Sequence, residues 1–245
     1  MDEPSLDLEK PNAVGALDRI TTNVAISLLA VVPTFIACIL APWRLSGLIK
    51  GDDPNGRAGM LLAPGAFFPL SLLLSMILGA LLTTPELANR NGAFLGPNLA
   101  LSIQDAISQG DVWRTIGTIM PIYAFTIVAG ALGAILGKWA QQEWSLRISL
   151  RAAFYIVGTF VSWVILSTAA IDITRASTQN YQLVETLTLV MTLPALAVVL
   201  WMYFWFFRAE GAVSIMRSAI LSIAMIVLLF LAVIGMGLMS NFGQS

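Results

Sequence analysis

Long uncharged stretches alternate with short charged ones along this chain. The runs without Asp, Glu, Lys or Arg cover 20–43, 58–85, 115–137, 152–171, 186–207 and 218–245. A helix of about 20 apolar residues crosses a hydrocarbon core of roughly 30 Å. The pattern therefore predicts an all-α polytopic membrane helix bundle. We expect a five-span membrane domain over 58–245, with spans at 58–85, 115–137, 152–171, 186–207 and 218–240.

The first uncharged run, 20–43, differs from the others because Pro33 lies at its centre. Proline removes a backbone donor and clashes with the preceding turn, so a helix tends to kink or break there. We expect two half-length pieces that enter and leave the membrane on one side, giving a re-entrant or interfacial segment over 20–57. The alternative is a kinked sixth span.

The distribution of basic residues favours the first of these arrangements. If 20–43 does not cross, ten basic residues share one side and Arg90, Arg114 and Arg175 lie on the other. If it crosses, the count is eight against five. Lys and Arg near span ends keep a loop in the cytoplasm. We therefore expect a cytosolic N-terminus, and Ser245 on the opposite side of the membrane.

Three connecting segments have patterns of their own. Residues 1–19 are acidic, contain two prolines, and are expected to form a mobile tail. Residues 42–50, PWRLSGLIK, place apolar and basic side chains on different faces, as in an interfacial helix. Within the long connection 86–114, the stretch PNLALSIQDAISQGD predicts a short amphipathic surface helix.

Composition removes several function classes. Only 11% of the residues are charged and 58% are apolar, which is typical of a membrane protein rather than a soluble domain. Histidine is absent and cysteine occurs once, so no metal-ligand spacing is present. The net charge of −1 gives no basic field for nucleic acid. We find no nucleophile with a base and no phosphate loop, and expect no enzyme activity, catalytic residue, cofactor or metal.

The order of these features resembles the Yip family of five-span membrane proteins (Rab-GTPase-interacting proteins), in particular its bacterial members. The similarity covers about 42–240. It rests on the layout and on phrases such as SLRISLRAAFYIVG and the EGAVSIMRSA turn. The Asp-Leu-Tyr-Gly-Pro phrase of the eukaryotic members is absent, and GMLLAPGAFF stands in its place. The resemblance implies a cytosolic N-terminus before five spans, no catalytic residues, and partners that are themselves membrane proteins.

Two groups of residues are candidates for contacts. The basic set near span ends could face lipid or a partner, and consists of Lys138, Arg147, Arg151, Arg208 and Arg217. The small residues Gly130, Gly133 and Gly137 offer a close-packing helix face. The aromatic run that precedes Arg208 is typical of a membrane-interface belt.

Two functions remain open from the sequence. The first is a non-catalytic organiser or accessory subunit that binds lipids, itself, or other integral membrane proteins. For this protein we expect a location in a bacterial cytoplasmic (inner) membrane. The second is a small oligomeric permease or channel. A permease needs a polar cavity at mid-membrane, with Tyr123, Thr126, Ser162, Thr188 or Thr192 lining it. Among the acids, Asp172 lies closest to a long apolar run, followed by Glu185.

Overall fold

The computed structural model describes residues 13–51, 61–82, 112–139, 145–178, 181–211 and 214–242, and these residues contain helices and no strand. In chain order the helices are α1 (Ala13–Leu40), η1 (Pro42–Leu45), α2 (Ser46–Lys50), α3 (Pro64–Leu82), α6 (Val112–Trp139), α7 (Leu146–Ser177), α8 (Tyr181–Gly211) and α9 (Ile215–Phe242). The predicted all-α membrane helix bundle is confirmed.

Four of the described helices are long and apolar enough to cross a membrane: Met120–Trp139, Leu146–Arg175, Gln182–Arg208 and Ile215–Ala232. Helix α3 has a shorter apolar stretch, Pro64–Gly79. Its 19 residues correspond to about 28 Å of helix, close to the hydrocarbon thickness of roughly 30 Å. The fifth span at 58–85 therefore stays a prediction.

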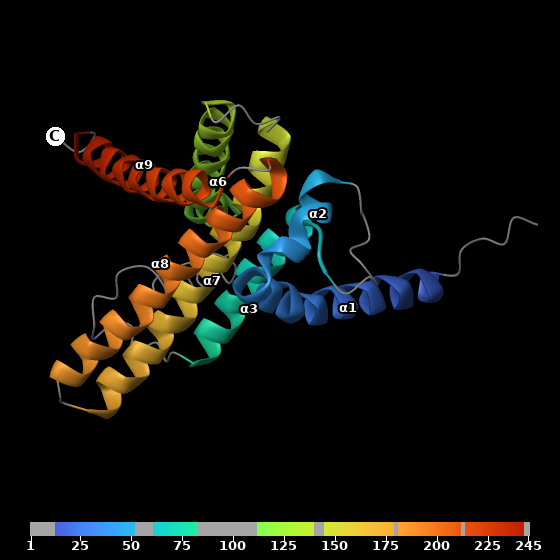
Figure 1. Ribbon diagram of the computed structural model, residues 1–245. Helices are drawn as coiled ribbons and strands as arrows, with labels where there is room; N and C mark the ends of the chain where they lie inside the picture. Colours follow the sequence, from blue (N-terminus) through green and yellow to red (C-terminus); the bar gives the residue numbers. More distant parts are fainter. Residues whose placement is uncertain are drawn as a thin grey trace, which may run out of the picture.

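Helix α7 is the centre of the bundle, and Figure 1 shows α8 running beside it in the opposite direction. It packs against α3, α6 and α8, and also touches α1 and α2. Its buried side chains include Tyr155, Ile156 and Ile165. Because helices from both halves of the chain contact α7, it holds them in one unit.

The contact between α3 and α7 is built from small and hydroxylated residues. The Ser75 hydroxyl lies 3.3 Å from that of Ser162, whose own hydroxyl donates to the Ser71 carbonyl at 3.2 Å. Opposite Ser71 is Gly158, where a Cβ would lie only 3.1 Å from the Ser71 Oγ. Small residues let two membrane helices approach until such hydroxyls meet.

The glycines of α6 lie against the first turns of α7. A Cβ added at Gly130 would lie 3.1 Å from the Leu150 Cα, and one at Gly133 would collide with the Ser149 hydroxyl. Gly137, one turn further on, is also buried. These contacts are within the chain, between α6 and α7.

Helix α1 passes through Pro33 without interruption. The expected pair of half-length helices is therefore replaced by one helix of 28 residues. Directly after Pro33, the Thr34 hydroxyl donates to the Ala30 carbonyl at 2.7 Å and accepts from the Leu62 N–H at 3.0 Å. The chain changes direction later, at Ala41, where η1 begins. Cys38, the only cysteine, is fully buried in this region.

The ends of the helices differ from the expected spans. Helix α1 begins at Ala13, inside the predicted tail 1–19. Helices α7 and α8 extend into the predicted connection 172–185, since α7 ends at Ser177 and α8 begins at Tyr181. The amphipathic surface helix predicted within 86–114 lies outside the described residues.

Candidate functional site

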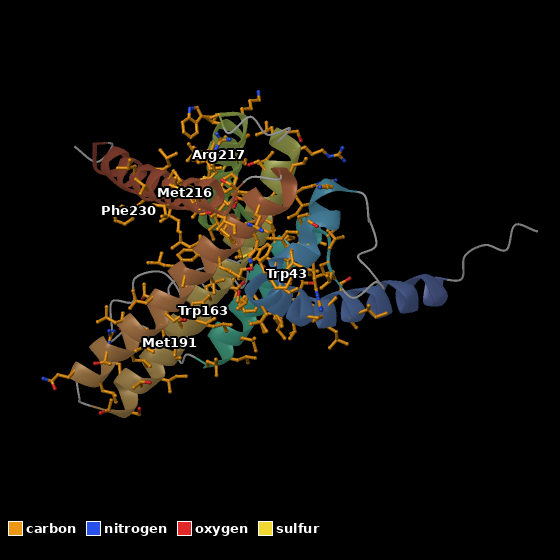
Figure 2. The ribbon with its side chains drawn as sticks, viewed as in Figure 1. Trp43, Trp163, Met191, Met216, Arg217 and Phe230 are labelled. Atoms are coloured by element: carbon orange, nitrogen blue, oxygen red, sulfur yellow. The ribbon has the colours of Figure 1, made fainter. Side chains whose placement is uncertain are left out.

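The basic candidates gather at one end of the bundle. Helices α6 and α8 end there, and α7 and α9 begin there, so Lys138, Arg147, Arg151, Arg208 and Arg217 are all found at that end. We call this surface the basic end. Lys138, Arg147 and Arg217 are exposed there, whereas Arg151 and Arg208 are half-buried. Figure 2 labels Arg217 at the start of α9.

Arg151 is used within the chain. Its Nη1 donates to the Ile49 carbonyl, at 3.0 Å, in the last turn of α2. The next residue but one, Gly51, has φ of +88° and ends the helix in the left-handed conformation. Any side chain at Gly51 would collide with the Arg151 guanidinium. Arg151 therefore satisfies a carbonyl at a helix end and fixes the segment 42–51 against α7.

The same segment is fixed to α8 by aromatic rings. The Trp43 ring lies 4.9 Å from that of Trp205 and 6.5 Å from that of Trp201, measured between centroids. The Arg208 guanidinium carbon lies 5.9 Å from the centre of the Trp205 ring, within cation–π range. Trp43 is labelled in Figure 2. The aromatic run of α8 thus has a partner ring from the N-terminal part of the chain.

The residue Leu62, just before α3, is held to α1 and α7 by its backbone groups. Leu62 donates its N–H to Thr34, and its carbonyl accepts from the Tyr155 hydroxyl at 2.6 Å. Both polar groups of this non-helical residue are therefore satisfied, as irregular backbone at membrane depth requires. At the first turn of α7, the Ser145 hydroxyl accepts from the Ile148 N–H and caps the helix.

The structure brings together the five basic residues that the sequence singled out. It adds Trp43 and its neighbour Arg44, which the sequence placed in an interfacial helix but did not connect to α8. A local signal for this contact was present in the sequence. Trp43 and Arg44 combine an interface aromatic with a cation, as Trp205 and Arg208 do one turn apart. Neither of these local patterns shows that the segment containing Trp43 packs against α8.

The hydroxyl groups proposed for a permease have different environments. Thr126 is buried and donates to the Ile122 carbonyl of its own helix at 2.8 Å. Ser162 contacts α3, and Tyr123 packs edge-on against Phe68. Thr188 and Thr192 line a groove between α7 and α8, and each donates to the carbonyl four residues earlier. The side chains of Asp172 and Glu185 lie outside the described ones.

A cavity between α6, α7, α8 and α9 is lined only by apolar side chains. Its volume is about 140 Å³, and Phe125, Val199 and Leu229 are among its walls. An apolar cavity of this kind does not retain water. It offers no binding group for an ion or a polar solute.

Comparison with known proteins finds no family, no curated protein and no solved structure that matches this chain. The resemblance to the Yip family accordingly has no support from these comparisons. What can be inferred about function rests on the helices and the basic end.

Proposed function

We propose that this chain is a non-catalytic integral membrane protein, an organiser or accessory subunit that binds lipids and other membrane proteins through its basic end. We place it in a bacterial cytoplasmic membrane with its N-terminus in the cytosol. The exposed cations Lys138, Arg147 and Arg217 lie beside the half-buried Arg208. Each basic residue near an anionic membrane surface contributes about 1 kcal/mol of attraction.

The observation that carries this proposal is the contrast between the ends and the middle of the bundle. The described cations lie at helix ends, whereas the cavity between α6, α7, α8 and α9 is lined only by apolar side chains. The hydroxyls of Ser75, Ser162 and Thr126 are engaged by groups within the chain. Such an interior favours dry helix packing over a pathway for a polar solute.

The segment 42–51 adds a reason for binding at the basic end. Arg151 holds it to α7, and Trp43 holds it to α8. A rigid arrangement of aromatic rings and cations at a membrane interface is suited to lipid headgroups and to the ends of neighbouring helices. Because Arg151 serves the fold, it is not a suitable residue for testing the binding surface.

The test is a triple variant, Arg147→Gln, Arg208→Gln and Arg217→Gln, with Arg151 left intact. We expect it to retain its fold and to lose enrichment of phosphatidylglycerol at the basic end. The readout is energy transfer from tryptophan to pyrene-labelled phosphatidylglycerol in phosphatidylcholine vesicles. Trp43, Trp201 and Trp205 lie within this end and act as donors.

The matched control is the triple Lys variant at the same positions, which keeps the charge. It should retain the transfer efficiency, and should co-purify the same membrane proteins as the native chain. Equal transfer and equal co-purification by the Gln triple variant would count against the proposal. Proton- or ion-coupled flux into protein-containing vesicles would favour the permease instead.

A further inference from the structure

A groove runs between α7 and α8 on the side of the bundle away from the basic end. Its volume is about 270 Å³, and its walls extend from Phe160 to Arg175 on α7. The helix rises about 22 Å between these two residues, more than the roughly 15 Å of one membrane leaflet. Both walls belong to helices long and apolar enough to cross a membrane.

The groove is kept open by a side chain that bridges its walls. The Trp163 indole donates to the Met191 carbonyl at 2.9 Å, and Figure 2 labels both residues. Pro194 has no N–H to donate to the Val190 carbonyl four residues earlier, so the turn that contains Met191 is weakened. The indole therefore satisfies backbone in a weakened turn and spaces α8 from α7.

The chemistry of the groove lining indicates what can fill it. Its inner part is lined by apolar side chains, and its outer end carries hydroxyl groups and an arginine. A phospholipid has the same division, with an apolar acyl chain and an anionic headgroup. In a bilayer, a groove between two spans is bordered by acyl chains.

The polarity of the groove changes along its length. Towards the ends of α7 and α8 that lie opposite the basic end, it is lined by hydroxyls, Ser167 and Thr188 among them, and by the half-buried Arg175. Towards mid-bundle its walls are Phe160 and Leu196. Both of these residues also line the apolar cavity, so the groove and the cavity adjoin.

We infer that this groove is a binding site for one membrane phospholipid. The phosphate lies near Arg175 and Thr188, one acyl chain follows the groove past Trp163, and its end reaches the apolar cavity beyond Leu196. Arg175 has other interactions within the chain, and its positive charge complements the phosphate from the mouth of the groove.

The site deepens the lipid-binding part of the proposed function, but it lies at the opposite end of the bundle. Failure of the two can therefore be separated. Loss of the groove lipid leaves phosphatidylglycerol enrichment at the basic end unchanged. Conversely, the Gln triple variant at the basic end leaves the groove lipid in place.

The experiment uses the full chain, delipidated and then reconstituted with phosphatidylglycerol that carries a diazirine in one acyl chain. After photolysis, mass spectrometry of peptides locates the cross-links. We expect them to concentrate in 160–171 and 188–196. Leu196→Trp fills the junction with the cavity and should lower this cross-linking about tenfold. Arg175→Gln should lower lipid retention about fivefold.

Leu193→Trp is the matched control, since Leu193 is on the same helix, is 62% exposed, and does not line the groove. It should cross-link as the native chain does. Cross-links spread evenly over the outward faces, or unchanged in Leu196→Trp, would overturn the inference, as would cross-links that join two copies of the chain. If Leu196→Trp does not fold, Thr188→Leu carries the same test at the polar end.

Discussion

Helix α7 meets α3 on one side and α8 on another, and the two contacts are made differently. Against α3 it presents Gly158 and Ser162, and hydroxyls meet backbone across a close contact. Against α8 it presents Trp163, whose indole bridges the space to Met191 and leaves a groove of about 270 Å³. The size of the side chains at the interface decides whether two membrane helices close against each other or leave room for lipid.

This difference has a consequence for tolerance to substitution. A contact made by small residues has no spare volume, so an added side chain must displace a helix. A contact bridged by one long side chain depends on that residue and tolerates changes around it.

The fully buried Cys38 is the only thiol in the chain, and labelling it with a thiol-reactive dye during heating measures unfolding.

The largest effect is expected for Gly158→Leu. A Cβ there would lie 3.1 to 3.3 Å from Ser71, Phe67 and Phe68, so the side chain would force α3 away from α7. We expect a loss of about 3 kcal/mol in the free energy of unfolding, seen as early labelling of Cys38. Gly65→Leu is the control, because nothing lies within 4 Å of its Cβ position. Equal stability of the two variants would show that α3 and α7 are not closely packed.

A smaller effect is expected for Trp163→Phe, on the other side of α7. The ring volume is largely kept, but the Met191 carbonyl loses its indole donor. The loss of one such hydrogen bond costs about 0.5 to 1.5 kcal/mol. Hydrogen exchange should rise in the turn around Met191 and stay unchanged at the α3 contact. Unchanged exchange near Met191 would mean that the indole does not stabilise the turn before Pro194.

Ser162→Ala tests the hydroxyls of the close contact without adding volume. It removes the donor to the Ser71 carbonyl and the neighbour of the Ser75 hydroxyl. Hydrogen bonds between membrane helices contribute about 0.6 kcal/mol on average, so we expect a loss of this size in thermal unfolding. Ser167→Ala, in the groove wall, is the matched control and should change stability less. The reverse order would contradict the comparison.

The smallest effect is expected for Thr192→Ile. Thr192 lines the groove, is exposed, and donates only along its own helix to Thr188. Isoleucine replaces the hydroxyl by an ethyl group, which uses existing space, so the change in unfolding free energy should stay below about 0.5 kcal/mol. A large loss would mean that the groove closes in the folded protein.

The sequence predicts the helices well because their signal is local. Uncharged runs located α6, α7, α8 and α9, although the helices extend past the first charge: Asp172 ends an apolar run but does not end α7. At Pro33 the local signal was misleading, because it predicted a helix break that the structure does not have. A proline costs one hydrogen bond, and the surrounding helix tolerates that cost, so α1 does not break.

Only part of the candidate site could be predicted from the sequence. The location of the basic residues follows from their positions at span ends, but the sequence does not show which of them stabilise the fold and which are exposed for binding. Arg151 binds the Ile49 carbonyl, a partner 102 residues away, and no local pattern distinguishes it from Arg147. Likewise, the spacing of Ser71, Ser75 and Gly79 matches that of Gly133 and Gly137, yet spacing does not specify which helix lies opposite.

The partner of α3 also sets the order in which the protein can assemble. The Ser162 hydroxyl and the Ser71 carbonyl are separated by 91 residues. At a synthesis rate of about 5 to 20 residues per second, α3 waits roughly 5 to 18 s before its partner exists. During that interval its serines and Gly79 face lipid or the insertion machinery. The N-terminal helices of this protein therefore depend on a later segment of the same nascent chain to complete their packing.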